Sequence, residues 1–110
     1  MLFKEGRQFS VFPFKIFWVD KNPFSSVQVG VGVSSRNFKK ATDRNHIKRL
    51  MREAYRLQKN ILIEKLSACQ KRFSVFILYT GKDLPDYEII SGKMDSVIKR
   101  LTRIADEKDQ

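Results

Sequence analysis

Lysine and arginine side chains recur every three or four residues between positions 36 and 59, and this spacing gathers positive charge on one side of a helix. The residues that share this face are Arg44, Asn45, Lys48, Arg49, Arg52, Arg56 and Lys59. Like charges placed side by side repel one another, so a polyanion such as a nucleic-acid backbone is the natural partner. The alternative interpretation is a solvated helix face without a partner. Glu53 lies at the margin of this face, one turn from both Arg49 and Arg56, and is expected to pair with one of them.

The same stretch lacks the side chains that cleave a phosphodiester bond. A two-metal nuclease needs converging carboxylates, and an acid–base nuclease needs paired histidines or a Glu–His pair with an orienting base. His46 is the only histidine, and Asp43 and Glu53 lie ten residues apart, about three helical turns. Cys69 is the only cysteine, which excludes an internal disulfide and a cysteine zinc cluster. We therefore predict no catalytic residue and no metal site in this chain.

Length and charge bound the architecture and the class of partner. A chain of 110 residues suffices for one modest core, so residues 1–110 are treated as a single domain. Net charge is +10, and residues 36–59 carry nine Lys or Arg against two acidic residues, a local excess of +7. No apolar run approaches the ~20 residues of a membrane-spanning helix, and the N-terminus lacks a signal-peptide core. These features predict a soluble, cytoplasmic protein with a local surface for a polyanion and no membrane contact.

An apolar face at helical spacing predicts the helix that must carry the basic face. Its members are Ile47, Leu50, Met51, Ala54, Leu57, Gln58 and Ile61, followed by Leu62 and Leu66. Gln58 is the single polar residue among them. Thr42 is the predicted N-cap, and Asn60 marks an expected bend or break.

A strand is predicted over residues 10–19, where apolar residues alternate. Its core face carries Phe12, Phe14, Ile16 and Trp18. Lys15 and Phe17 share the second face, which suits either the stacking of an unpaired base or a second buried layer. Pro13 indicates an edge strand or a bulge.

Further elements follow along the chain. Residues 27–34 alternate valine with Gln28, Gly30, Gly32 and Ser34 as a strand, and the glycines permit close approach of the basic helix or of a phosphate chain. Residues 73–79 form an apolar run typical of an interior strand. A last helix begins after Pro85-Asp86, and its apolar positions are Ile90, Met94, Val97, Ile98, Leu101 and Ala105.

The order of these elements predicts the fold class. Residues 2–6 resemble the last turn of a helix that ends at a glycine, and a further strand is expected near residues 23–27. We predict an α+β fold, an α/β sandwich in which helices pack on a mainly antiparallel four-stranded sheet. A right-handed crossover is the default for the strand–helix–strand unit between residues 29 and 79.

The basic run also resembles a known signature. Its elements are Lys39-Lys40-Ala41, Arg44-Asn45, Lys48-Arg49 and Arg52-Glu53, at the spacing of the protein subunit of bacterial ribonuclease P. The resemblance extends outward through residues 29–34 and Arg56-Leu57.

Three positions depart from the pattern of that family. Thr42 stands where valine is common, and Ser35 stands where lysine is usual. His46 replaces the last arginine of an Arg-Asn-Arg triplet, which exchanges a permanent charge for a titratable one.

The resemblance implies a fold detail and a function. The crossover is expected to be left-handed, against the general default. In this family the RNA subunit holds the catalytic magnesium ions and removes the 5′ leader of precursor tRNA by hydrolysis, so no cofactor is expected on the protein alone. The expected partners are the RNA subunit and the leader of precursor tRNA, with no DNA partner. A generic RNA-binding or ribosome-associated protein is the alternative.

The site residues implied by the resemblance form two groups. Residues expected to bind RNA are Arg36, Lys39, Lys40, Arg44, Asn45, His46, Lys48, Arg49, Arg52 and Arg56. Phe3, Lys15 and Phe17 are expected to line a cleft for the single-stranded leader. Family members begin well before the position of Phe3, so the family's N-terminal helix is expected to be mostly absent from this chain.

Overall fold

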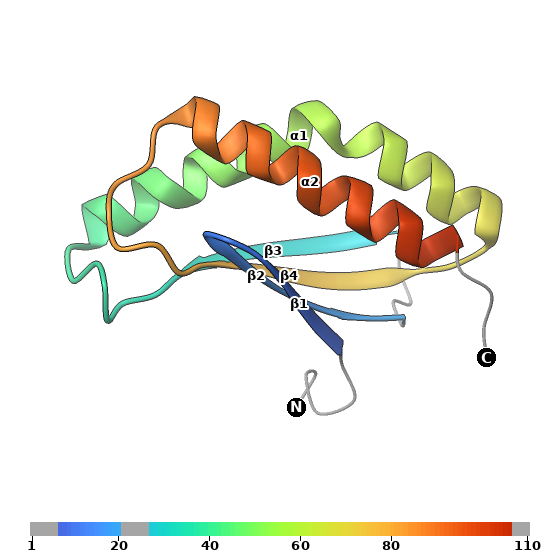
Figure 1. Ribbon diagram of the computed structural model, residues 1–110, viewed down its shortest axis with the longest axis horizontal. Helices are drawn as coiled ribbons and strands as arrows, with labels where there is room; N and C mark the ends of the chain where they lie inside the picture. The colour runs from blue at the N-terminus through green and yellow to red at the C-terminus, as the bar shows by residue number, and fades with distance from the viewer. Residues whose placement is uncertain (1–6, 21–26, 107–110) are drawn as a thin grey trace.

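The computed structural model describes residues 7–20 and 27–106, which form a four-stranded sheet with two helices on one of its faces (Figure 1). In chain order the elements are β1 (Arg7–Val11), β2 (Phe14–Val19), β3 (Val27–Val33), α1 (Ala41–Cys69), β4 (Phe73–Tyr79) and α2 (Tyr87–Asp106). The predicted α+β fold is confirmed. The helical turn expected at residues 2–6 and most of the extra strand expected near residue 23 lie outside the described residues.

The strands lie in the order β1-β2-β4-β3. The β1–β2 and β2–β4 pairs are antiparallel, and β3 pairs with β4 in parallel. The sheet is therefore mixed, although antiparallel pairs predominate as predicted. Strand β4 is an interior strand, in agreement with its continuous apolar run. Helix α1 connects the parallel neighbours β3 and β4, so these three elements form the expected βαβ unit.

The single strand predicted over residues 10–19 is wrong, because the chain reverses at Phe12 and Pro13. Strands β1 and β2 form a hairpin in which Val11 pairs with Phe14. The Pro13 carbonyl accepts hydrogen bonds from the Thr80 amide at 2.8 Å and from its hydroxyl at 3.0 Å. These bonds fix the turn to the end of β4. Phe12, which was predicted to face the core, lies in the turn and is 74% exposed.

Helix α1 begins earlier than predicted and has no break at Asn60. Its N-cap is Lys40, without a side-chain capping bond, so the assignment of Thr42 is wrong. Ile47, Met51 and Ala54 are buried as predicted, but the apolar face ends differently.

The second half of α1 faces the core through Leu62 and Leu66, both fully buried. Leu57 and Ile61 are 61% and 63% exposed, so their predicted burial is wrong. Gln58 lies beside α2, where its Nε2 donates to the Ser91 carbonyl at 3.1 Å. This bond explains a polar residue on an otherwise apolar face, because a half-buried amide needs a partner.

The core lies between the helices and the covered face of the sheet. All six apolar positions predicted for α2 are buried: Ile90, Met94, Val97, Ile98, Leu101 and Ala105. From the sheet, alternate residues of β2 and β4 point towards them, and Trp18 packs on Phe73 with ring centroids 4.9 Å apart. Burial of this face supplies the main free energy of folding.

The face of β3 that carries Gly30 and Gly32 is covered by an aromatic ring from the neighbouring strand β4. Gly30 pairs with Phe76, and the Phe76 ring extends over Gly32. A Cβ atom on Gly32 would lie 2.5 Å from Phe76 Cζ. The expected neighbours of these glycines, the basic helix or a phosphate chain, are therefore corrected to the ring of Phe76.

Candidate nucleic-acid interface

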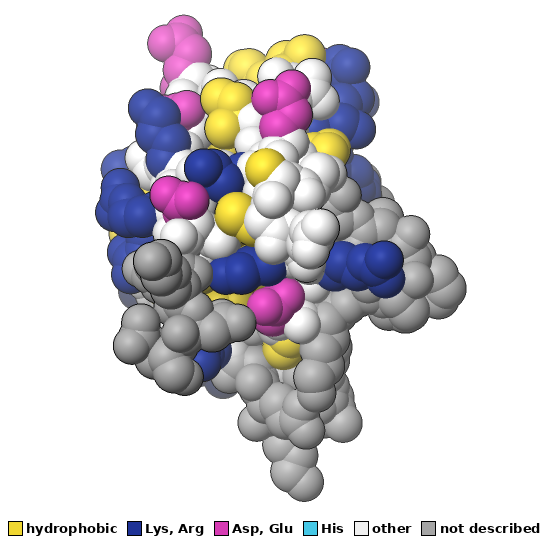
Figure 2. All heavy atoms as spheres, turned by 90° about the vertical axis from the view of Figure 1, so that its right-hand side faces the viewer, with side chains coloured by type: hydrophobic (Ala, Val, Ile, Leu, Met, Phe, Trp, Pro, Cys, Tyr) yellow, Lys and Arg dark blue, Asp and Glu magenta, His cyan; other side chains and the backbone are white. Residues whose placement is uncertain are grey.

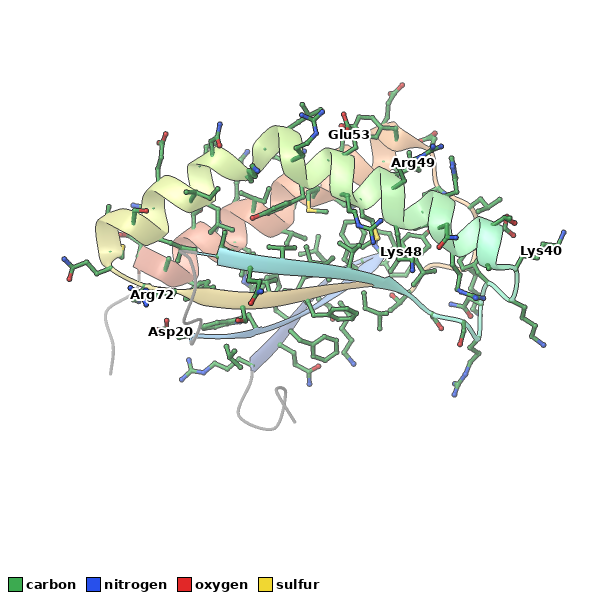
Figure 3. All side chains as sticks on the ribbon, turned by 180° about the vertical axis from the view of Figure 1, so that it is seen from behind. Asp20, Lys40, Lys48, Arg49, Glu53 and Arg72 are labelled. Atoms are coloured by element: carbon green, nitrogen blue, oxygen red, sulfur yellow. The ribbon has the colours of Figure 1, made fainter. Side chains whose placement is uncertain are left out.

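The first half of α1 presents a line of polar and cationic side chains to solvent. Asn45, Arg49, Arg52 and Arg56 follow i, i+4, i+7 and i+11 spacing, and all four are exposed. Buried Ile47, Met51 and Ala54 anchor the opposite side of the same turns. Figure 3 shows Arg49 on the outer side of the helix. The structure therefore brings these four predicted residues together on one rigid surface, which we call the outward line.

One acidic side chain orients part of this line. Glu53 accepts two hydrogen bonds from Arg56, from Nε at 3.2 Å and from Nη2 at 2.7 Å. The hydrogen bond and the charge of Arg56 lower the pKa of Glu53, and Glu53 in turn raises the pKa of Arg56. The predicted pairing of Glu53 is thus confirmed for Arg56. The bidentate geometry holds the guanidinium in place on an exposed surface.

The segment 34–40 connects β3 to α1 and is held by side-chain bonds. Arg44 Nη1 donates to the carbonyls of Phe38 and Lys39, both at 2.9 Å. Asn37 Nδ2 donates to the carbonyls of Thr80 and Gly81, both at 3.2 Å. Arg44 therefore has a structural contact that its place in the basic run did not reveal. The bonds also explain why α1 begins before Thr42, since they fix the preceding backbone.

The other predicted RNA-binding residues lie around the outward line. Arg36, Lys39 and Lys40 are exposed on the connecting segment, and Lys40 marks the start of α1 in Figure 3. Lys48 is half-buried on the side of α1 that faces β3. His46 is exposed on the opposite flank, so the structure places it apart from the outward line.

The second candidate surface is the face of the sheet opposite the helices. Phe17, Phe76 and Leu78 are half-buried there, and Lys15 is exposed. Lys15 Nζ lies 5.7 Å from the centroid of the Phe17 ring, a cation–π distance. Within residues 7–20 and 27–106, no helix covers this face (Figure 1). Phe17 thus forms part of a partly accessible apolar platform, and Phe3 lies outside the described residues.

A hollow of about 730 Å³ continues this platform towards α1. Its lining residues are Ser34, Ser35, Arg36, Asn37, Leu78 and Lys82. Leu78 belongs to both surfaces, because it pairs with Lys15 on the open face and also lines the hollow. Lys82 is not among the site residues predicted from the sequence. The available signal was a lysine directly after an interior strand, where loops commonly carry function.

The described part of the chain offers neither a metal site nor a helix that could cross a membrane. Over residues 7–20 and 27–106, no three His, Cys, Asp or Glu side chains lie close enough together to bind a metal ion. Neither α1 nor α2 combines the length and apolarity that a bilayer-crossing helix requires. The described surface is instead marked by cations, hydroxyls, amides and one aromatic platform, which are groups that contact phosphates and bases.

Comparison with known proteins decides the family. The family model for ribonuclease P matches residues 1–102. This chain belongs to the ribonuclease P protein family. The ribonuclease P protein component of Porphyromonas gingivalis is 33% identical over 108 residues, covering 94% of this chain and 75% of that protein. The component from Chlorobaculum tepidum is 51% identical over 49 residues, covering 44% of this chain and 32% of its own length.

Solved structures of ribonuclease P proteins share the fold. The protein from Thermotoga maritima superposes with a TM-score of 0.71 at 26% identity, covering 89% of this chain and 86% of that one. The Staphylococcus aureus protein gives a TM-score of 0.70 at 18% identity, with coverage of 88% and 82%. As a member of this family, the chain is a protein component of an endoribonuclease that matures the 5′ end of tRNA.

Proposed function

We propose that this ribonuclease P protein binds the RNA subunit through the outward line of α1. We further propose that it guides the 5′ leader of precursor tRNA across the open face of the sheet. The observation that carries this proposal is the continuity of the two surfaces. The platform of Phe17 and Phe76 leads past Lys15 to the hollow, and the hollow leads to the start of α1.

Each part of this surface suits a different component of RNA. Arg49, Arg52 and Lys48 provide positive charge without a described acidic partner, so they suit phosphates of a folded RNA. Phe17 offers a partly accessible ring, on which an unpaired base can stack without sequence preference. Arg36 and Lys82 line the hollow between them and suit the backbone of the leader as it passes.

We assign hydrolysis and its magnesium ions to the RNA subunit. The carboxylates on the described part of α1 do not converge, and Glu53 is held by Arg56. The protein contributes by binding and orienting, which lowers the magnesium concentration that the folded RNA requires. Because each phosphate contact contributes close to one unit to the slope of log K against log salt, binding is expected to weaken steeply with salt.

The testing experiment is cleavage of precursor tRNA at low magnesium with four mixtures: substrate alone, with the protein, with a bacterial ribonuclease P RNA, and with both. We expect cleavage at the mature 5′ end only when both are present. Cleavage by the protein alone would indicate a nuclease site in this chain. If the protein does not stimulate cleavage by the RNA, the proposal is overturned, and a generic RNA-binding protein is the remaining interpretation.

Variants then test the assigned residues. Arg49→Gln with Arg52→Gln is expected to reduce affinity for the RNA subunit about tenfold or more at moderate salt, because two phosphate contacts are lost. Lys65→Gln with Lys99→Gln removes the same charge from side chains paired with Asp106 and Asp95 and serves as the matched control. Equal binding of the two double variants would contradict the role of the outward line.

A further inference from the structure

Helix α2 carries a second cationic surface that no sequence motif indicated. Ile89, Lys93, Ser96, Arg100 and Arg103 follow i, i+4, i+7, i+11 and i+14 spacing. All five are exposed, and none of them is acidic. Lys93 and Arg103 are about 15 Å apart along the helix axis at 1.5 Å per residue. We call this line of residues the α2 stripe.

Acidic residues lie on the other flank of α2. Asp95 binds Lys99 at 3.1 Å, and Asp106 binds Lys65 of α1 at 3.4 Å. On α1, Glu53 and Glu64 are exposed on the flank opposite Lys48. The acidic groups therefore gather along the ridge where the two helices meet, and they separate the α2 stripe from the outward line.

The two cationic surfaces lie on opposite flanks of the molecule. Figure 2 looks along the long axis from the end where both helices terminate and shows that Lys and Arg side chains lie on both flanks of this end of the molecule. Helix α2 lies in front of α1 in Figure 1, and the outward side of α1 is seen from behind in Figure 3. One RNA helix lying on α1 would therefore leave the α2 stripe free for another RNA segment.

Aromatic rings of the hairpin contact one arginine of this stripe and one arginine of β1. The Arg100 guanidinium lies 4.8 Å from the centroid of the Phe9 ring, and the Arg7 guanidinium lies 5.7 Å from Trp18. Among the described residues, no carboxylate forms an ion pair with either arginine. A stacked guanidinium keeps its in-plane donors available and loses less conformational freedom on binding than a free side chain. Arg7 and Arg100 are thus preorganised for planar anionic groups such as phosphates.

We propose that the α2 stripe, with Arg7, binds the phosphate backbone of a second RNA segment while the outward line holds the first. This inference rests on the proposed function, since it adds a contact to the same RNA partner. The α2 stripe contains no acidic residue, and its Arg100 is held in a fixed orientation. Such a surface favours binding of a polyanion with regularly spaced charges, such as an RNA backbone. Two opposed contacts make the protein a clamp between RNA segments, so its binding also restrains their relative position.

The first test compares two double variants of equal net charge. Arg100→Gln with Arg103→Gln removes two cations from the α2 stripe, and Lys65→Gln with Lys99→Gln removes two from the acidic ridge. The affinity for ribonuclease P RNA is measured over a range of salt concentrations, after thermal melting shows that both variants are folded. We expect the stripe variant to lower the log–log salt slope by nearly two units and the ridge variant to leave it nearly unchanged. Equal slopes for the two variants would overturn the proposal.

A third arm separates this proposal from the proposed function. If Arg49→Gln with Arg52→Gln weakens binding but the stripe variant does not, the α2 site is wrong and the α1 assignment stands. If neither changes the affinity, the proposed function itself fails. If both lower the slope, both surfaces contact RNA.

A measurement that does not depend on removing charge completes the test. Ser96→Cys, in a Cys69→Ser background, provides a single thiol in the middle of the α2 stripe. A thiol-reactive photo-crosslinker is attached there. We expect crosslinks to one defined segment of the RNA in the assembled complex. Glu64→Cys on the acidic ridge is the matched control and is expected to crosslink weakly. Equal crosslinking from the two positions, or none from Ser96→Cys, would contradict a specific RNA contact at α2.

Discussion

The two faces of the sheet differ although they are built from the same strands. On β4, Phe73, Val75, Ile77 and Tyr79 are buried beneath the helices, whereas the intervening residues on the other face are half-buried. On β2, Phe14 and Ile16 are buried on the covered face, while Lys15 is exposed on the open one. The alternation of a strand thus assigns stability to one set of residues and, in the proposed function, leader binding to the next. Substitutions at adjacent positions should separate the two properties.

The largest effect is expected from truncating the covered face. Ile77 is 1% exposed, so Ile77→Ala removes buried methyl groups and leaves a cavity, at a cost of about 2–5 kcal/mol in the free energy of unfolding. Leu78→Ala, one residue away on the open face, is expected to cost roughly 1 kcal/mol, because less apolar surface returns to water. Urea denaturation of both variants checks this difference. Similar losses would show that the open face is covered as well.

A smaller effect is expected from filling the space above β3. Gly32→Ala places a Cβ about where the Phe76 ring lies, so the ring must move, and we expect a loss of about 1–3 kcal/mol in stability. Gly92 in α2 has no atom within 4 Å of its added Cβ. Gly92→Ala should therefore stabilise the helix by about 1 kcal/mol. Thermal denaturation should shift the melting temperature of the two variants in opposite directions.

The platform should affect binding more than folding. Phe17→Ala is expected to weaken binding of a precursor tRNA with a long leader by about 1–3 kcal/mol, the usual effect of losing one base stack. A substrate with a single-nucleotide leader should bind this variant and the parent protein alike. Phe12→Ala, in the exposed hairpin turn, is the control and should change neither affinity. An equal loss of affinity for both substrates would show that Phe17 does not contact the leader.

The last effect is confined to alkaline pH. Burial raises the pKa of Tyr55 to about 12, because the ionised phenolate is poorly solvated beside the core. In the unfolded chain the Tyr55 side chain ionises near pH 10. The stabilisation from neutral Tyr55 in the folded protein is therefore complete below pH 10 and disappears as pH rises to about 12. Absorbance titration should show late tyrosine ionisation, and Tyr55→Phe should reduce it; burial also raises the pKa of Tyr79, which should account for the remainder. The variant should also lose less stability between pH 10 and pH 12 than the parent protein.

Periodicity made much of this molecule predictable. The six buried positions of α2 and the interior strand β4 were predicted because the burial of each depends on a regular local repeat. The hairpin was missed because Phe12 continues the even-numbered alternation of Phe14 and Ile16. A two-residue turn exchanges the parity of the buried positions, so Phe9 and Val11 pack on the core together with Phe14. No repeat in residue type marks that exchange.

The candidate site was less predictable where one side chain has two uses. Arg44 belongs to the basic run by spacing, yet its guanidinium binds the carbonyls of the segment before α1. Leu57 and Ile61 belong to the apolar face by spacing, yet no described element covers them fully. Lys82 has no repeat around it, and only the fold places it beside Arg36. Such cases depend on partners from distant parts of the chain, which a local pattern does not contain.

The uninterrupted length of α1 also restricts how this sequence can change its length. Its first half displays the outward line, and its second half is fixed to the core by Leu62 and Leu66. One residue inserted or deleted between Arg56 and Leu62 would rotate one half against the other by about 100° and turn the cations away from the proposed RNA contact. The β1–β2 turn has no such constraint on rotation. Gaps between relatives should therefore collect in the turns and connecting segments, and α1 should keep a constant number of residues.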